Sequence, residues 1–104
     1  MIRTHVYAPA AAADLREIAR YTTKQWGVAQ ARSYIKQIDD AAAAVASGQG
    51  VFRTPSELQP GLLVATSGKH YIFCLPRQGQ PALILAVLHE RMDLIARLRD
   101  RLRA

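Results

Sequence analysis

The side chains of this 104-residue sequence that are best suited to chemistry are three histidines and one cysteine. His5, His70 and His89 have the residue type of a general acid or base near neutral pH, although a hydrogen-bonded structural histidine is commoner. Cys74 stands in an apolar run, which favours a small buried hydrophobic residue over a nucleophile. No glycine-rich phosphate loop, metal-ligand cluster or Ser-His-Asp order accompanies them. We therefore expect no catalytic residues, no bound metal and no cofactor.

A charged turn follows an apolar strand in residues 87–93 (VLHERMD), and strand ends are common places for function. Its ionic side chains can form a local hydrogen-bonded network, or Arg91 can instead bind a carboxylate or a phosphate. The last fourteen residues carry five arginines against two aspartates, a net +3 of the +6 of the whole chain. Such a basic segment suits nucleic acid or an acidic protein segment, and a solvated helix face is an equally good interpretation.

Length and composition describe one domain with a modest core. The chain is 50% apolar and 21% charged, which is typical of a folded protein and leaves little room for a large cofactor chamber. The single cysteine cannot form an internal disulfide and fits a reducing compartment. No apolar stretch approaches the roughly 20 residues of a membrane span, and the N-terminus lacks an apolar signal segment. We therefore expect a cytoplasmic protein.

The apolar periodicity of the first half predicts a short strand and two helices. Residues 2–7 alternate as a half-buried strand does. From about residue 11 to 26, and again from 28 to 47, apolar residues recur at three- and four-residue steps, which predicts a helical hairpin that turns at Gly27. Asp14 lies near the start of the first helix, where it suits the helix dipole. We expect Trp26 to anchor the first helix to the second.

In the second half the apolar period changes from 3.6 to 2. Residues 51–61 contain prolines and glycine and are predicted as a loop. Three strands follow, at 62–66, 70–75 and 82–88, and their turns favour an antiparallel meander. The last strand is apolar on both faces, which predicts a central position covered by the hairpin on one side and by another element on the other. Residues 92–103 are predicted as a short helix with Ile95, Leu98 and Leu102 on one side.

Several short segments, taken together, resemble one known family. In the helical half these are residues 12–18 (AADLREI) with Tyr21, 25–27 (QWG), Gln30-Ala31 and Tyr34-Ile35. In the sheet half they are residues 60–62 (PGL), 67–70 (SGKH) with Ile72-Phe73, and 87–93 (VLHERMD). In this order and spacing, the sequence resembles the ParE branch of the ParE/RelE toxins of bacterial toxin-antitoxin systems over nearly its whole length.

The resemblance implies a single toxin domain over residues 1–104 with an α+β fold. The element order would be β-α-α-β-β-β, with the helical hairpin packed on a small, mostly antiparallel sheet and a short C-terminal helix. The resemblance also implies a cognate ParD-like antitoxin as partner, in a heterotetramer or larger complex, and no contact with membranes. DNA would be reached only through the antitoxin or through DNA gyrase.

Two activities divide this superfamily, namely inhibition of DNA gyrase and ribosome-dependent cleavage of mRNA. RNA cleavage requires groups that activate the 2′-OH and stabilise charge. Leu63 and Ala86 occupy positions where the family often has arginine, and no tyrosine follows Met92. We therefore expect a non-enzymatic gyrase inhibitor. The alternatives are an inactivated toxin that only binds its antitoxin, and a ribosome-dependent endoribonuclease that would use Lys69, His70, Arg77, His89 or Arg91.

Two sets of residues follow as candidate binding surfaces. The candidates for binding gyrase are the basic residues in and before the tail, namely His89, Arg91, Arg97, Arg99, Arg101 and Arg103. The candidates for binding the antitoxin are expected on the hairpin and the sheet edge, namely Leu15, Ile18, Tyr21, Tyr34, Ile38, Arg53 and Tyr71. Deletion of residues 95–104 is expected to leave a folded protein that binds antitoxin but has lost activity.

Overall fold

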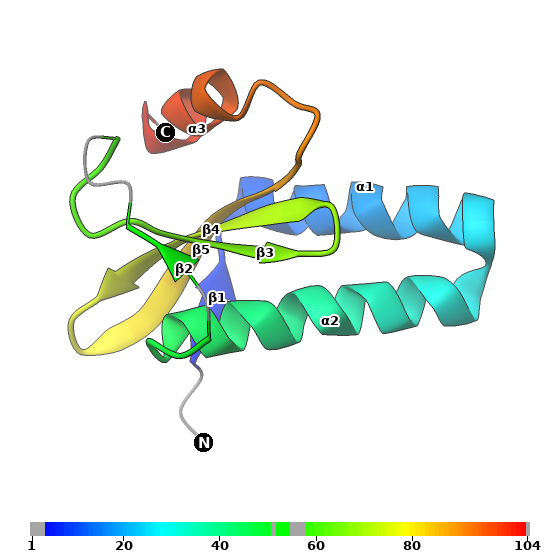
Figure 1. Ribbon diagram of the computed structural model, residues 1–104, viewed down its shortest axis with the longest axis horizontal. Coiled ribbons are helices and arrows are strands. Elements are labelled where there is room, and N and C mark those ends of the chain that lie inside the picture. The colour runs from blue at the N-terminus through cyan, green and yellow to red at the C-terminus, as the bar shows by residue number, and fades with distance from the viewer. Residues whose placement is uncertain (1–3, 51, 55–57, 104) are drawn as a thin grey trace.

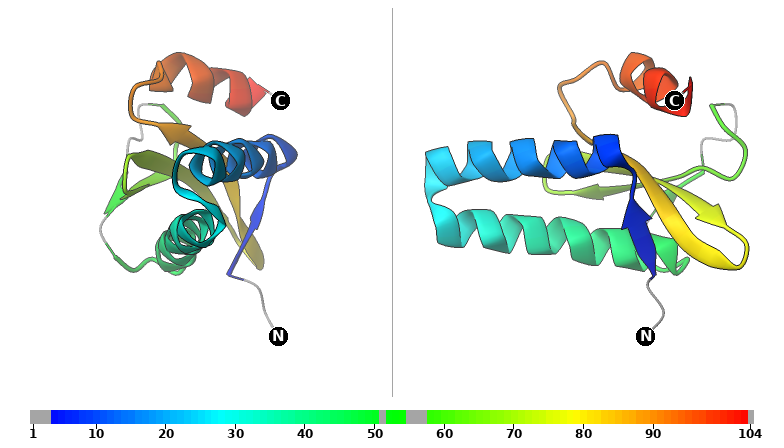
Figure 2. Two further views of the ribbon diagram at one scale, coloured as in Figure 1. Left: turned by 90° about the vertical axis from the view of Figure 1, so that its right-hand side faces the viewer. Right: turned by 180° about the vertical axis from the view of Figure 1, so that it is seen from behind.

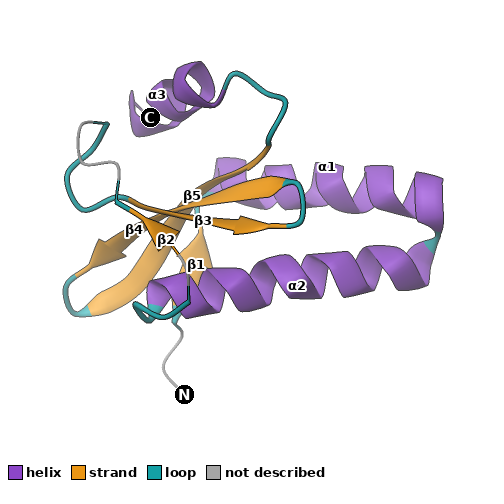
Figure 3. Cartoon of the chain, viewed as in Figure 1, coloured by secondary structure: helices purple, strands orange, loops and turns teal. Residues whose placement is uncertain are grey.

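The fold has three layers, in which one five-stranded sheet lies between a helical hairpin and a C-terminal helix (Figure 1). The computed structural model describes residues 4–50, 52–54 and 58–103. The sheet order is β1-β5-β4-β3-β2, in which β1 runs parallel to β5 and the other neighbours are antiparallel. This α+β arrangement, with its helical hairpin and C-terminal helix, confirms the expected fold class (Figure 3). The elements are β1 (His5–Tyr7), α1 (Pro9–Trp26), α2 (Val28–Ala46), β2 (Phe52–Arg53), β3 (Leu63–Ser67), β4 (His70–Arg77), β5 (Gln80–His89) and α3 (Leu94–Arg103).

The sheet contains one strand that the sequence did not predict. β2 lies within the predicted loop and pairs Phe52 with Ala65 at the outer edge of the sheet. A strand of two residues shows no alternation that a sequence pattern can detect. Residues 51 and 55–57 of that loop, and residues 2 and 3 of the predicted first strand, lie outside the described residues. The three strands of the meander are confirmed, with ends displaced by at most two residues.

One glycine joins the two long helices. Gly27 has a φ of 95° and serves as both the C-cap of α1 and the N-cap of α2, a conformation that L-residues rarely adopt. α1 begins at Pro9. Proline lacks a backbone N–H, and this costs nothing in the first turn of a helix, because the N–H groups there have no acceptor within the helix. The far ends of both helices project beyond the sheet, as Figures 1 and 2 show. Trp26 lies at this projecting end and is 73% exposed, so the expectation that it anchors the hairpin is wrong.

Two apolar cores enclose β5, one on each face of the sheet. The first lies under the hairpin, where Ile38 and Val45 of α2 share a buried cluster with Ile84 of β5. The second lies under α3, where Leu98 shares a buried cluster with Leu88 of β5. The prediction that this strand is covered on both sides is confirmed, and α3 is the second cover.

A β-bulge allows β5 to supply side chains to both cores. Phe73 and Cys74 of β4 pair with Ala86 and Ile84, so that Leu85 has no partner on β4. The extra residue shifts the alternation of the strand, and residues 84–88 are all buried as a result. Cys74 is fully buried, and burial raises the pKa of its thiol to about 11. The prediction of an inert, buried cysteine is therefore confirmed.

The C-terminal helix is a layer of the fold. Asp93 caps its first turn by accepting a backbone hydrogen bond. Leu98 is 1% exposed, and Leu94 and Leu102, one turn away on either side, pack beside it. The apolar face therefore differs from the predicted one, because Ile95 is 51% exposed. Within the described residues, no helix is long and apolar enough to cross a membrane.

An ion pair ties α1 to α3 across the edge of β5. Arg101 donates hydrogen bonds to the Asp14 carboxylate at 2.8 Å and 2.7 Å, and another to the backbone oxygen of Leu85 at 3.1 Å. Asp14 also accepts a hydrogen bond from the backbone N–H of Val87 at 3.0 Å. β1 pairs only with an earlier part of β5, so the ion pair satisfies backbone groups on an otherwise open edge. Asp14 therefore acts at the sheet edge and not on the helix dipole as expected.

Shortening Leu98 should test whether α3 unfolds together with the rest of the protein. Leu98→Ala should lower the free energy of unfolding by about 2–5 kcal/mol, because it leaves a cavity beneath the helix. Ile95→Ala, an exposed position on the same helix, should cost less than about 1 kcal/mol. Equilibrium unfolding in urea measures both. If the two losses are equally small, α3 is dispensable for folding. That result would agree with the expectation that the protein still folds when residues 95–104 are deleted.

Candidate functional site

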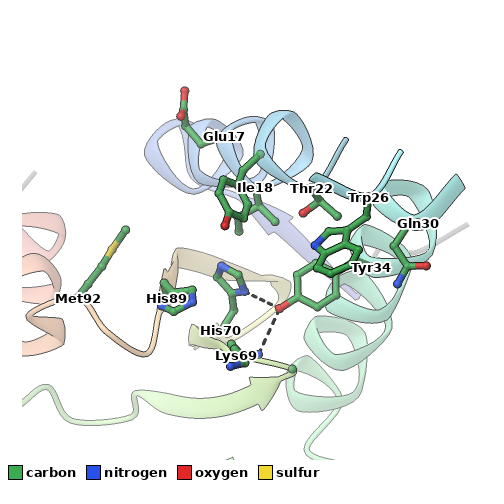
Figure 4. A pocket seen from close by; sticks show the side chains of 12 residues that line it. Glu17, Ile18, Thr22, Trp26, Gln30, Tyr34, Lys69, His70, His89 and Met92 are labelled. Atoms are coloured by element: carbon green, nitrogen blue, oxygen red, sulfur yellow. Dashed lines mark hydrogen bonds between the residues drawn. The ribbon is translucent and has the colours of Figure 1, made fainter. Parts of the chain in front are cut away.

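A groove of about 540 Å³ opens between the projecting hairpin and the β3–β4 turn (Figure 4). α1 and α2 form its walls, and the β3–β4 turn and the end of β5 form its floor. It therefore gathers side chains from four separate stretches of the chain. Those used below are Tyr21 and Trp26 of α1, Tyr34 of α2, Lys69 and His70 at the turn, His89 at the end of β5, and Met92 beyond it.

A partly buried hydrogen-bond network fixes the floor of the groove. The Tyr34 hydroxyl lies 2.6 Å from Nδ1 of His70 and accepts a hydrogen bond from the backbone N–H of Lys69 at 3.2 Å. The Tyr34 side chain also packs against Gly68, whose φ is 57°. A Cβ atom at this glycine would lie 2.7 Å from Tyr34. Both the backbone conformation and the close approach therefore require glycine here.

Two histidines lie side by side on the floor. His70 and His89 face each other across β4 and β5, with ring centroids 5.2 Å apart and planes at 89°. Nδ1 of His89 accepts a hydrogen bond from the backbone N–H of Arg91 at 3.1 Å. Burial, followed by the neighbouring His89, lowers the pKa of His70. His70 is therefore an uncharged imidazole at neutral pH.

The gyrase-binding candidates occupy three different settings. His89 belongs to the groove, whereas Arg91, Arg97, Arg99 and Arg103 are exposed in and before α3. Arg101 differs from the others because Asp14 and the backbone of Leu85 take its donors. We therefore remove Arg101 from the candidate set, since binding a partner would break the ion pair that holds α3.

The antitoxin-binding candidates do not form one surface. Ile18, Tyr21 and Tyr34 line the groove, and Leu15 lines a separate shallow groove on the hairpin. A third hollow beside α3 contains Arg53 and Tyr71. Ile38 is fully buried in the first core, so it has no surface to offer a partner and leaves the set.

A second polar network, which the sequence did not indicate, ties β1 to α2. Oδ1 of Asp39 accepts a hydrogen bond from the Tyr7 hydroxyl at 2.6 Å and lies 2.9 Å from Nε2 of His5. Partial burial opposes ionisation, but the hydrogen bonds from Tyr7 and His5 outweigh it and lower the pKa of Asp39. Burial and the contact with Asp39 raise the pKa of Tyr7. Because Asp39 lies 32 residues from Tyr7 in the chain, no local pattern could have paired them.

The two positions that lack arginine lie on opposite faces of the sheet. Leu63 packs against the core under the hairpin, and Ala86 is fully buried in the core under α3. Arg77 is also set apart, because it donates two hydrogen bonds to the backbone oxygen of Pro81 at the far end of β4. Of the residues that RNA cleavage would need, the groove thus brings together only Lys69, His70 and His89.

Comparison with known proteins defines the class to which this fold and groove belong. A family model described as "ParE toxin of type II toxin-antitoxin system, parDE" matches residues 6–94. The chain is therefore a toxin of a type II toxin-antitoxin system. Within that class it belongs to the ParE family, as the resemblance of the sequence indicated.

Curated relatives agree with this assignment. Toxin ParE of Escherichia coli is 52% identical over 99 residues, covering 95% of this chain and 96% of that protein. Toxin ParE1 of Caulobacter vibrioides is 33% identical over 88 residues, covering 85% and 90%. A solved structure titled "Chromosomal ParDE TA system from P. aeruginosa" has a TM-score of 0.66 at 20% identity, covering 86% of this chain and 96% of that one. At that identity it shows a shared fold.

Replacing Gly68 should disturb the floor of the groove. Gly68→Ala should lower the melting temperature more than Gly79→Ala, because both have positive φ but only Gly68 would also collide with Tyr34. The difference isolates the contact with Tyr34 from backbone strain. Thermal unfolding followed by circular dichroism measures both variants. Equal losses would contradict a structural role for the Gly68–Tyr34 contact.

His70 should make the protein less stable in mild acid. The unfolded chain binds a proton at His70 near the ordinary pKa of 6.5, whereas the folded protein binds it only at lower pH. The free energy of unfolding should therefore fall as the pH drops from about 6.5 through the folded-state pKa, and less so in His70→Asn. Urea unfolding at a series of pH values measures this. Asp39 changes the stability only below its ordinary pKa of 3.8, so it does not interfere with the measurement of His70. An NMR titration that places His70 above 6.5 would contradict the prediction.

Proposed function

We propose that this ParE toxin inhibits DNA gyrase without chemistry of its own and is neutralised by a ParD-like antitoxin. The observation that carries the proposal is membership of the ParE family along almost the whole chain, including a relative that is 52% identical. Inhibition of gyrase and pairing with a ParD-like antitoxin are what that membership implies. The toxin–antitoxin complex would be a heterotetramer or larger.

The distribution of polar groups favours a non-enzymatic inhibitor over a ribonuclease. Leu63 and Ala86 pack in the two separate cores. Arg77 is held at the far end of β4 by its hydrogen bond to the backbone oxygen of Pro81. The groove retains two imidazoles and one lysine, but no arginine lines it within the described residues. Among the described residues, the groove therefore offers no arginine to stabilise the charge that develops on a phosphate during RNA cleavage.

The exposed arginines of the tail form the surface that we propose for gyrase. Arg97, Arg99 and Arg103 stand on α3, which is held against the sheet by Leu98 and by the Asp14–Arg101 ion pair. A rigid helix presents its charges at lower entropic cost than a flexible tail does. Arg91, in the turn before α3, extends this basic surface.

The antitoxin is proposed to cover the hairpin and the groove. Ile18, Tyr21 and Tyr34 present a partly exposed aromatic and apolar surface there. A toxin with a net charge of +6 suits an acidic antitoxin segment that becomes ordered on binding.

A supercoiling assay with purified gyrase tests the proposal. With reactions stopped by detergent, we expect linear DNA to accumulate and added antitoxin to abolish it. The double variant Arg99→Ala/Arg103→Ala should need at least about ten times more protein for the same effect, because each arginine contributes charged contacts. Arg16→Ala/Lys24→Ala, exposed on α1, removes the same charge and should behave as the parent. Unchanged gyrase activity with folded parent protein would contradict the proposal and favour either a ribosomal target or an inactivated toxin.

A further inference from the structure

Two imidazoles form the centre of the groove floor. His70 and His89 are directly opposite each other on β4 and β5, so their side chains lie on the same face of the sheet, with ring centroids 5.2 Å apart. Both residues line the groove, and Figure 4 shows their rings side by side below α1. Imidazoles change charge near neutral pH, and two of them this close together titrate as a coupled pair.

The protein itself occupies the Nδ1 atom of each ring. Nδ1 of His70 lies 2.6 Å from the Tyr34 hydroxyl, and Nδ1 of His89 accepts the backbone N–H of Arg91. Neither Nε2 atom has a hydrogen-bond partner among the described residues, in which no buried side-chain nitrogen or oxygen lacks one. Both Nε2 atoms are therefore accessible from the groove. The Tyr34 hydroxyl accepts from the Lys69 N–H and can donate to Nδ1 of His70, so each neutral ring can carry its proton on Nε2.

The permanent charges around the pair nearly cancel. The charged and titratable groups that face it come from every element around the groove, namely Asp14, Glu17 and Tyr21 of α1, Tyr34 of α2, Lys69 of the β3–β4 turn, and Glu90 beyond β5. Asp14 is paired with Arg101, and Glu17 with Arg20. In the part of the chain that the structure describes, Lys69 forms no ion pair. The attraction of the groove for an anion therefore depends on whether the imidazoles bind a proton.

A bound carboxylate would change the protonation of the pair. In the free protein, burial, followed by the neighbouring His89, lowers the pKa of His70. A negative charge at hydrogen-bond distance has the opposite effect, because it favours the imidazolium form. Binding of a carboxylate and binding of a proton are therefore linked, and each strengthens the other by the same factor.

We propose that an acidic side chain of the antitoxin reaches the Nε2 atoms of His70 and His89, and that the pair takes up a proton when the complex forms. This inference rests on the proposed function, and it adds to the antitoxin surface a contact group and a dependence on pH. The neutral rings already donate N–H groups to the carboxylate, so the complex forms at neutral pH and becomes tighter in mild acid.

An acidic peptide also fits the rest of the groove. Tyr21 and Trp26 are 65% and 73% exposed on its walls, and they can pack against the apolar side chains that flank the carboxylate in such a segment. The net charge of +6 favours an acidic partner over a basic one. In mild acid the free toxin loses stability through His70, whereas the complex gains affinity through the same side chain.

Calorimetry of the full-length toxin with its antitoxin counts the proton. At pH 6.5, titrations in two buffers of different ionisation enthalpy should show uptake of about 0.5–1 proton per toxin. The Kd should fall about five- to tenfold between pH 8 and pH 6, because a pKa shift of about one unit corresponds to a tenfold change in affinity.

A double variant assigns the proton to the pair. His70→Gln/His89→Gln retains hydrogen-bond donors but removes both titrating rings, so the Kd should change by less than about twofold over the same pH range. His5→Gln removes the third histidine of the chain, which lies on β1 outside the groove, and should behave as the parent. Comparison with the parent also cancels any proton that the antitoxin takes up by itself. Circular dichroism checks that both variants are folded.

A decaglutamate peptide tests the pair in the unaltered toxin and without the antitoxin. In an NMR titration at low salt, a saturating amount of this peptide should raise the pKa of His70 by at least about 0.5, because its carboxylates stabilise the imidazolium. The pKa of His5, outside the groove, should change less.

Three results would overturn this inference alone. They are the absence of proton uptake by the parent, equal uptake by the parent and the double variant, and a titration of His70 that decaglutamate leaves unchanged. Failure of the antitoxin to bind at every pH would contradict the proposed function and this inference with it. The two kinds of failure are therefore distinguishable.

Discussion

The rest of the structure depends on β5, because its apolar side chains project from both faces of the sheet. Exposure of either set of side chains to water would be unfavourable, so both faces must be covered. The hairpin covers one face, and α3 covers the other. A helix of ten residues is marginal by itself. It is held by Leu98 in the core and by Arg101, whose pairing with Asp14 also satisfies the open edge of β5. One buried strand thus accounts for the three layers.

The groove is a by-product of the position of the hairpin on the sheet. α1 and α2 are 18 and 19 residues long, and the end at which they join projects past the sheet. Tyr34 bridges the overhang to the β3–β4 turn and orders Lys69 and His70. The rings of Tyr21 and Trp26 consequently face solvent beside a polar floor that the sheet holds in place. Rigidity of the floor and exposure of the wall therefore have one cause.

Much of the fold could be predicted from the sequence, because it follows from local periodicity. The hairpin turn at Gly27, the meander and the double-faced character of β5 were each confirmed. The site was less predictable. Ile38 and Tyr21 were both expected on the antitoxin-binding surface, yet one is fully buried and the other 65% exposed, since only packing against the sheet decides which part of a helix is covered. The partner of Arg101 lies 87 residues away, beyond any local pattern.

By itself, the sequence determined the order and type of every element except β2, together with membership of the ParE family, because both depend on residue types at short spacings. Only the tertiary structure decided which charged and aromatic residues are available to a partner. It assigned Arg101 and Asp14 to an internal ion pair, and it brought His70, His89 and Tyr34 together on one floor while leaving Trp26 in solvent. The physical reason is that exposure and pairing are properties of packed surfaces, which form between segments far apart in the chain.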